Sequence, residues 1–313
     1  MSEQIYRSGF VSLIGRPNVG KSTLLNQLSG MHLAITSPKP QTTRALVRAI
    51  VTDDNSQIVF LDTPGMLRPK NRLGESMKAS VHTAIREADV IAVLVDATAA
   101  TAKQAYPGVP QKEEELLKLA FSRQVPVVLL LNKVDRVRKE ALLPLIALYA
   151  SAYSFAAILP VSARTGDGID ELLDQLRQLL PQGAPVFPAD MVTDQTERSL
   201  TAELIREQIL YHTEKEIPHG TAVTIESFEE PVDESGERLR AVIHAVITCE
   251  RDTHKGILIG KGGSMLKQIG QDARQRIEQM LGCPCYLELF VKVREDWRNR
   301  PGMLRGLGFD DQN

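Results

Sequence analysis

The sequence predicts a doubly wound α/β domain followed by a smaller α+β domain. Three observations support this prediction: a glycine-rich loop between a strand and a helix, a series of apolar strands that alternate with helices, and a new element order after a proline-rich segment. We place the first domain at residues 1–181, a linker at residues 182–193 and the second domain at residues 194–313.

The length of 313 residues predicts two domains, and a composition with 43% hydrophobic residues agrees with a soluble chain, whereas the net charge of −2 says little by itself. Its three cysteines include no C-x-x-C pair, which argues against a disulfide framework or a zinc site and fits a reducing compartment. No signal peptide is recognisable, and no uncharged apolar run reaches the roughly 18 residues of a membrane span. We therefore expect a soluble, cytoplasmic protein that is at most peripheral on a membrane. We also expect a monomer.

A glycine-rich loop follows the first predicted strand, residues 10–14. The sequence GRPNVGKS at residues 15–22 matches the pattern G-x-x-x-x-G-K-[ST]. A strand that turns through glycines into a helix start directs backbone N–H groups and the positive end of the helix dipole at an anion. The alternative, a glycine-rich turn with an unrelated Lys-Ser pair, does not explain the flanking strand and helix. The residues that we expect to hold a nucleotide here are Gly15, Arg16, Pro17, Asn18, Val19, Gly20, Lys21, Ser22 and Thr23.

Strands and helices alternate through the rest of the first domain. Two strands flank the polar turn at residues 53–56 and are expected to form a hairpin. Three later apolar runs are typical of parallel strands that are buried on both faces. These strands are predicted at residues 45–51, 57–61, 90–95, 125–131 and 157–161, with helical patterns at residues 113–122 and 169–180.

The sequence Asp62-Thr63-Pro64-Gly65 follows the second strand of the predicted hairpin. A carboxylate at this position is expected to act on Mg²⁺ through water, while Ser22 ligates the ion directly. Gly65 can supply a backbone N–H to the γ-phosphate, since no side chain is in the way. Taken alone, Asp-Thr-Pro-Gly could equally form an ordinary turn.

The sequence Asn132-Lys133-Val134-Asp135 ends the strand at residues 125–131 and indicates the base. A carboxylate at Asp135 can accept hydrogen bonds from both N1–H and the 2-amino group of guanine. Adenine lacks both donors, so a buried carboxylate would be left unpaired at a cost of about 1–3 kcal/mol. Lys133 can lie over the base, and Asn132 can tie neighbouring loops together.

A fourth short segment, Ser162-Ala163-Arg164, follows the last predicted strand and can offer a backbone N–H to guanine O6. All four motifs stand, in order, at the carboxyl ends of strands or in the loops beyond them, which is where an open α/β sheet binds ligands. The sequence therefore predicts a guanine nucleotide site.

On these motifs, the first domain resembles the translation-factor-related GTPases. The resemblance implies that Thr42-Thr43-Arg44 is the first switch, in which a threonine reaches Mg²⁺ and the γ-phosphate. We favour Thr43 over Thr42, and a plain polar loop is the alternative. The expected catalytic groups are Lys21, Thr43 and Gly65. The expected Mg²⁺ site consists of Ser22, Thr43 and Asp62.

Two positions bear on the rate of hydrolysis. Ras-like enzymes have a water-orienting glutamine directly after the D-x-x-G glycine, whereas this chain has Met66. We therefore expect slow hydrolysis that depends on positioning, charge neutralisation and a group outside this site. Asn18 is compatible with a K⁺ ion beside the phosphates, as in related GTPases, or with ordinary hydrogen bonding in the loop.

The second domain has the element order helix, strand, strand, helix, helix, strand. A glycine-rich loop of the form G-x-x-G lies between its two adjacent helices and resembles the loop with which KH domains clamp about four single-stranded nucleotides. The order of elements matches the second topological type of KH domain. The helices are predicted at residues 194–216, just before Gly260 and at residues 264–281, and the first of them has Asp194 as a possible cap. The strands are predicted at residues 222–229, 239–250 and 285–293.

The expected RNA-binding residues are those of the G-x-x-G loop and of the apolar helix end before it. Leu258 is expected to share the groove wall with them. A basic segment after the last strand, with Trp297, is either a further RNA contact or a solvated face. The loop residues are Ile257, Ile259, Gly260, Lys261, Gly262 and Gly263, and the basic residues are Lys292, Arg294, Arg298, Arg300 and Arg305.

A GTPase domain followed by a type II KH domain resembles the Era-like family of bacterial ribosome-assembly GTPases. The resemblance extends from Phe10 to about Phe309 and includes Gln41-Thr42-Thr43-Arg44. It implies GTP hydrolysis with Mg²⁺, binding near the 3′ end of small-subunit ribosomal RNA during 30S maturation, control of RNA engagement by the GTP state, and peripheral membrane association. Two alternatives remain: a second domain that binds protein or membrane, and a non-catalytic RNA chaperone that uses GTP only as a ligand.

Overall fold

The computed structural model describes residues 6–37, 39, 42–65, 69–98, 108–234, 236 and 238–309, so Gln41 and Met66 lie outside the described residues. The chain divides into two compact units. Residues 1–34, 43–68 and 77–194 form the first unit, and residues 35–42, 69–76 and 195–313 form the second. Among the described residues, no helix is both long and apolar enough to cross a membrane.

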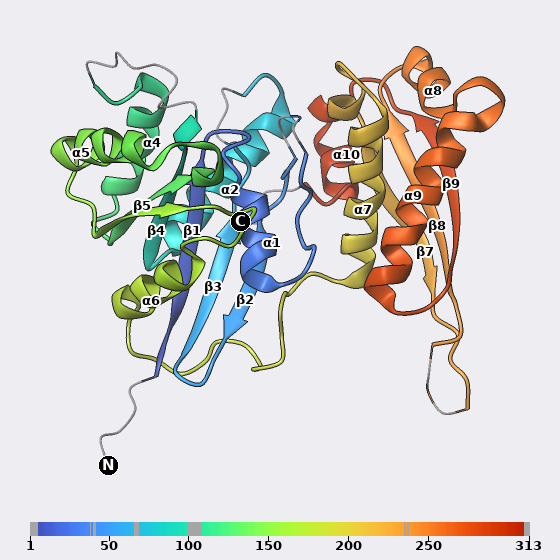
Figure 1. Ribbon diagram of the computed structural model, residues 1–313. Helices are drawn as coiled ribbons and strands as arrows, with labels where there is room; N and C mark the ends of the chain where they lie inside the picture. The colour runs from blue at the N-terminus through green and yellow to red at the C-terminus, as the bar shows by residue number, and fades with distance from the viewer. Residues whose placement is uncertain are drawn as a thin grey trace. The chain divides into compact units, whose positions relative to one another are not determined.

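The first unit is built on a six-stranded sheet with the order β2-β3-β1-β4-β5-β6 (Figure 1). β2 and β3 pair as an antiparallel hairpin and all other neighbours are parallel, which confirms the predicted hairpin and doubly wound sheet. The strands are β1 (Arg7–Gly15), β2 (Val47–Thr52), β3 (Ser56–Asp62), β4 (Val90–Asp96), β5 (Val127–Asn132) and β6 (Ala157–Val161).

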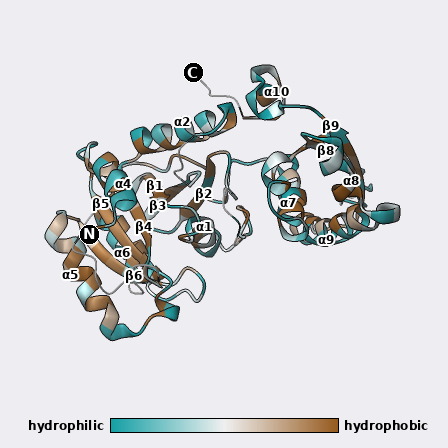
Figure 2. Cartoon of the chain, turned by 90° about the horizontal axis from the view of Figure 1, so that it is seen from above, coloured by the Kyte–Doolittle hydropathy of each residue, from teal (hydrophilic) through white to brown (hydrophobic). Residues whose placement is uncertain are grey.

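Helices cover both faces of this sheet. α2, α4 and α5 contribute to one apolar cluster with β1, β4 and β5, and α1 lies across the sheet from α2 (Figure 2). This arrangement brings the carboxyl ends of the parallel strands to one edge, where the four motifs follow them. The helices are α1 (Lys21–Ser29), α2 (Arg72–Glu87), α4 (Gln111–Phe121), α5 (Leu142–Ala152) and α6 (Ile169–Leu179).

The segment predicted as a linker is bound to the hairpin of the first unit. The fully buried side chain of Gln57 accepts hydrogen bonds from Val186 N (2.7 Å) and Phe187 N (2.8 Å) and donates one to Phe187 O (2.9 Å). Further on, Ile50 N donates to Val192 O at 2.8 Å. Both contacts satisfy backbone groups that a free linker would leave to water.

The second unit contains a three-stranded sheet with the order β7-β8-β9. β7 and β8 are antiparallel, whereas β8 and β9 are parallel, which gives the predicted KH topology. Buried isoleucines of α7, β8 and α9 form the core of this unit. The elements are α7 (Glu197–His212), β7 (Ala222–Glu229), β8 (Ala241–Cys249), α8 (Asp252–Ile259), α9 (Ser264–Leu281), β9 (Cys285–Val293) and α10 (Pro301–Gly306).

The start of α7 corrects the predicted helix cap. Thr196 is the N-cap, because its side chain accepts a hydrogen bond from Ser199 N at 3.1 Å. Asp194 instead forms an ion pair of 2.6 Å with Arg48 of β2. The helix therefore begins after Asp194, and the Asp194 carboxylate instead binds the segment before the helix to β2.

Candidate nucleotide and RNA sites

The glycine-rich loop joins β1 directly to α1 in the geometry of a phosphate loop. Gly20 caps the helix with φ 102° and ψ 22°, a left-handed conformation that favours glycine. Lys21 is almost fully buried, and its Nζ atom donates to the carbonyl oxygens of Gly15 (3.3 Å) and Arg16 (3.5 Å). Burial lowers the pKa of the Lys21 ammonium, while the nearby Asp62 carboxylate opposes that shift.

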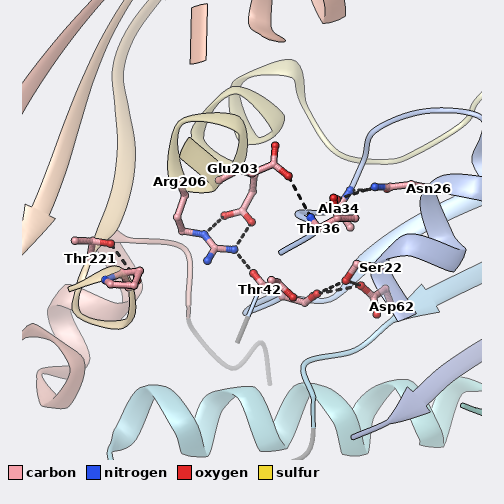
Figure 3. A network of polar contacts seen from close by, with 12 residues as sticks. Ser22, Asn26, Ala34, Thr36, Thr42, Asp62, Glu203, Arg206 and Thr221 are labelled. Carbon is pink, nitrogen blue, oxygen red and sulfur yellow. Dashed lines mark hydrogen bonds and ion pairs between the residues drawn. The ribbon is translucent and has the colours of Figure 1, made fainter. Parts of the chain in front are cut away.

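Three side-chain oxygens meet beside this loop. Ser22 Oγ donates to Asp62 Oδ2 at 2.8 Å, and Thr43 Oγ1 donates to the same oxygen at 3.0 Å (Figure 3). The two hydroxyls are 2.9 Å apart. The structure thus brings together the three residues that we predict to hold Mg²⁺, and Thr43 rather than Thr42 contributes the hydroxyl.

The second carboxylate oxygen of Asp62 indicates what these groups can bind. Oδ1 is buried and has no hydrogen-bond partner within the described part of the chain. Burial raises the pKa of Asp62, although Lys21, Ser22 and Thr43 act in the opposite direction. A buried carboxylate oxygen without a partner, next to two hydroxyls, suits a hard cation such as Mg²⁺.

The segment before Thr43 belongs to the second unit and is held by α7. Arg206 Nη2 donates to the carbonyl of Thr42, and Thr36 N donates to Glu207 Oε1 at 3.1 Å (Figure 3). Tyr211 OH donates to Thr36 O at 2.7 Å. We did not predict these contacts, since nothing in the sequence pairs residues so far apart.

Asn132 joins two loops of the first unit at the end of β5. Its Nδ2 donates to Val19 O at 2.8 Å, and its Oδ1 accepts from Ala163 N at 2.9 Å. The side chain is buried, so both bonds are shielded from water. This is the tie between loops that we expected of Asn132.

The geometry around Asp135 differs from expectation in one respect. Asp135 is exposed rather than buried, and its Oδ1 accepts a hydrogen bond of 2.8 Å from Ser162 Oγ. In the same loop, Ser162 N donates to Asp167 O and Ala163 N donates to Asn132, so these two N–H groups already have protein partners. The predicted hydrogen bond from a backbone N–H of this loop to guanine O6 stays a prediction.

The remaining residues of the second motif pack against the phosphate loop. A Cβ atom on Gly65 would lie 3.0 Å from Pro17 Cα, so the backbone at Gly65 lies close to this loop. Thr63 is fully buried and donates to Leu13 O at 2.8 Å. Thr63 therefore anchors the motif to β1.

Lys133 has a partner that the sequence did not indicate. Its Nζ donates to Asn18 O at 2.7 Å, across the phosphate loop, and to Asp96 Oδ2 at 2.6 Å. Asp96 ends β4 and belongs to none of the four motifs. Its position at the carboxyl end of a buried strand was the only signal available.

In the second unit, the G-x-x-G loop lies between α8 and α9. Gly260, Gly262 and Gly263 all have positive φ, at 72°, 60° and 80°. A Cβ on Gly260 would lie 2.8 Å from Met265 N, whereas a Cβ on Gly262 would meet nothing within 4 Å. The loop therefore presents open backbone at the N-terminus of the long helix α9, and Lys261 beside it is exposed.

The apolar residues before this loop are divided between groove and core. Ile257 is 49% exposed, whereas Ile259 is partly exposed and packs against the core cluster, so the groove wall stays a prediction. Leu258 is fully buried in the core, so its predicted place in the groove wall is wrong. The helical period of α8 explains the difference, because it turns Leu258 away from its neighbours.

Several side chains of the basic segment are held within the protein. Trp297 is fully buried and its Nε1 donates to Gly220 O at 3.0 Å, so it packs in the core. Arg298 forms a two-point hydrogen bond with Glu250, and Lys292 pairs with Glu226 at 2.8 Å. Arg298 is thus used in a structural pair, whereas Lys292, Arg294, Arg300 and Arg305 are exposed, so RNA contact by this segment stays a prediction.

Two family models match separate parts of the chain. One, described as a 50S ribosome-binding GTPase, covers residues 10–133, and the other, described as a KH domain, covers residues 216–298. With the site geometry, these matches define the class: a phosphate-loop GTPase joined to a KH domain.

Relatives that match over their whole length identify the family. The chain is 47% identical to the GTPase Era of Geobacter metallireducens over 99% of this chain and 100% of that protein. It is 46% identical to the GTPase Era of Trichlorobacter lovleyi, again over 99% and 100%. The chain belongs to the Era family of GTPases.

Two solved structures agree along nearly the whole chain. An Era variant from Aquifex aeolicus bound to GDP.AlF4- matches with a TM-score of 0.89 and 39% identity, covering 97% of this chain and 99% of that one. An Era in complex with MgGDPNP and nucleotides 1506–1542 of 16S ribosomal RNA matches with a TM-score of 0.90 and 40% identity, at the same coverage.

Proposed function

We propose that this GTPase binds single-stranded RNA from the 3′ region of small-subunit ribosomal RNA and assists maturation of the 30S subunit, with the GTP state controlling RNA engagement. The observation that carries the proposal is the open G-x-x-G backbone at the N-terminus of α9. Backbone N–H groups and a helix dipole suit a sugar-phosphate chain, and the exposed Ile257 suits unstacked bases. The 16S ribosomal RNA in the similar complex supports this RNA class.

In the first unit, the proposed chemistry is positioning and charge neutralisation. Lys21 and the loop N–H groups hold the β- and γ-phosphates, and Gly65 N–H contacts the γ-phosphate. Ser22 and Thr43 would hold Mg²⁺, with Asp62 acting through water; when bound, the ion neutralises charge on the β- and γ-phosphate oxygens. Met66 follows Gly65, and a thioether neither donates nor strongly accepts a hydrogen bond, so hydrolysis is slow.

In the base site, Asp135 accepts from guanine N1–H and the 2-amino group. The 2.8 Å bond from Ser162 Oγ orients its carboxylate before the base arrives. Asn132 fixes the adjoining loops, and Lys133 covers the base. Asn18 would hold a K⁺ ion beside the phosphates, and such an ion would supply the positive charge that other GTPases obtain from an arginine.

Binding of single-stranded RNA tests the proposed function directly. A labelled oligonucleotide with the 3′-terminal sequence of 16S RNA should bind the GTP-analogue form, and its duplex should bind more weakly. Gly262→Asp should remove most of this affinity because it places a carboxylate against phosphates, while GTP affinity stays unchanged. Aspartate tolerates left-handed φ better than most residues, and a Cβ at Gly262 meets no atom, so the variant should fold.

A matched control is available at the other end of the same helix. Gly282 also has positive φ, 71°, and open space at its Cβ position, so Gly282→Asp adds the same charge with the same backbone cost. It should leave RNA affinity unchanged. Equal RNA binding by a folded Gly262→Asp variant would reject the clamp, and a preference for protein or anionic vesicles over RNA would reject the RNA function.

The cellular setting is also part of the proposal. We propose a cytoplasmic monomer that associates peripherally with the inner face of the cell membrane. Sedimentation of the purified protein tests the monomer, and flotation with anionic vesicles tests the association. A dimer at micromolar concentration would reject the monomer. Protein that never floats with the vesicles would reject the membrane association.

A further inference from the structure

The ion pair between Asp96 and Lys133 lies beside the proposed base site, yet Asp96 belongs to no nucleotide-binding motif. Asp96 is the last residue of β4 and is in register with Asn132 at the end of β5. Its Oδ2 accepts a hydrogen bond of 2.6 Å from Lys133 Nζ. The lysine and aspartate side chains are only 25% and 19% exposed, which separates this contact from ordinary surface pairs that contribute little.

The carboxylate of Asp96 is itself fixed in orientation. Its Oδ1 accepts hydrogen bonds from Thr98 N at 2.9 Å and from Thr98 Oγ1 at 2.6 Å. Burial alone would raise the pKa of Asp96, but hydrogen bonds from Lys133 and Thr98 outweigh it and lower the pKa. The carboxylate is therefore charged at neutral pH, and Oδ2 is directed at Lys133.

Lys133 is constrained at both ends of its side chain. Its backbone has φ 69°, in the left-handed region that residues other than glycine seldom adopt. Its Nζ is shared between Asp96 Oδ2 and Asn18 O, at 2.6 and 2.7 Å. A free lysine would lose its rotamer freedom when a base binds, whereas these acceptors remove that freedom beforehand.

We propose that Asp96 is a positioning residue for the guanine nucleotide and acts through Lys133. By holding the ammonium against the phosphate loop, Asp96 keeps the aliphatic part of Lys133 where the base stacks. The inference rests on the proposed base site at residues 132–135 and adds a residue from another strand. It assigns Asp96 no contact with the nucleotide itself.

The isosteric change Asp96→Asn tests the proposal in the full-length protein. Affinity for GDP and for a non-hydrolysable GTP analogue should fall by about ten-fold, and equally for both, because the base site is common to them. In steady-state hydrolysis, KM should rise while kcat at saturating GTP stays within about two-fold, since other residues hold the phosphates. Asp53→Asn breaks a comparable pair, with Arg177 at 2.8 Å, away from the site and should leave both constants unchanged.

A double-mutant cycle with Lys133→Met separates this inference from the base site on which it rests. If Asp96 acts through Lys133, the double variant should bind GDP no more weakly than Lys133→Met alone. Additive losses, or a fall in kcat with KM unchanged, would overturn the role of Asp96 and leave the base site intact. Unchanged GDP affinity in Lys133→Met would overturn both. Thermal unfolding of each nucleotide-free variant shows whether it folds.

Discussion

A Cβ atom on Gly20 would lie 2.3 Å from the Nδ2 atom of Asn132. The phosphate loop and the base motif are therefore packed against each other with no room for one methyl group. Asn132 Nδ2 also donates to Val19 O at 2.8 Å, so the amide cannot move away without losing that bond. One contact thus joins the two halves of the nucleotide site.

Gly20→Ala should weaken both GDP and GTP binding by at least about ten-fold, because the clash displaces Asn132 and the backbone is strained at φ 102°. Isothermal titration measures the loss. Gly30→Ala is the matched control: Gly30 has φ 66° but no atom within 4 Å of its Cβ position. That variant should lose about 1 kcal/mol of unfolding free energy and no nucleotide affinity. Equal binding losses in the two variants would show that strain alone, not Asn132, is responsible.

Asp135→Asn should change the base preference from guanine to xanthine. The amide donates to the 2-oxo group of xanthine, but it cannot accept from both guanine donors as the carboxylate does. Guanine nucleotide affinity should fall by at least about ten-fold and xanthine nucleotide affinity should rise. Competition binding with GDP, XDP and ADP checks this. Equal affinities of the parent protein for ATP and GTP would contradict the assignment of Asp135.

Replacing K⁺ with Na⁺ at equal ionic strength should slow GTP hydrolysis by at least about three-fold if K⁺ lies beside Asn18. Asn18 has φ 64°, so Asn18→Gly removes the side chain without backbone strain. In that variant the rates in K⁺ and Na⁺ should be equal. A parent protein that hydrolyses GTP equally fast in both salts would remove K⁺ from the mechanism.

The stability of the first unit should depend on pH through Asp53. Burial alone would raise the pKa of Asp53, but hydrogen bonds from Asn55 N and Ser56 Oγ and the Arg177 guanidinium lower it below 3.8. A lowered folded-state pKa stabilises the fold above the unfolded value, and this contribution is lost as the pH falls through the folded value. Asp53→Asn should therefore cost about 1 kcal/mol or less at pH 7, and this cost should shrink as the pH falls through the lowered folded-state pKa of Asp53. Urea unfolding at a series of pH values measures the difference in unfolding free energy between the parent protein and Asp53→Asn. A difference that did not change with pH would contradict this prediction.

The sequence predicted the strands of both sheets because their apolar runs and turn residues are local signals. It did not predict α2 or α5. The run at Leu142–Ala152 is apolar on all sides and contains Pro144, which hides the helical period although a proline is tolerated in a first turn. α2 does carry buried Leu73, Met77 and Val81 at a spacing of four, so its period was present but not recognised.

The site residues also differ in whether a local sequence signal predicts them. Motif residues are defined by short segments, so Ser22, Asp62 and Asn132 could be predicted. Asp96 and Arg206 could not, because each depends on a partner from another element, and only the fold determines which elements are neighbours. Helix ends were also uncertain: Asp194 and Thr196 are both good caps by residue type, and the ion pair to Arg48 decides between them.

The strand order of the two sheets has a consequence for synthesis of the chain. The first sheet has all its strands once Val161 has been made, whereas β8 must wait for its parallel partner β9, which ends at Val293. At about 5–20 residues per second, several seconds separate these events during synthesis. The strands of the nucleotide-binding sheet are therefore available for pairing while the RNA-binding sheet still lacks an edge. The nascent chain thus acquires the means to hold guanine nucleotide before it acquires the means to hold RNA.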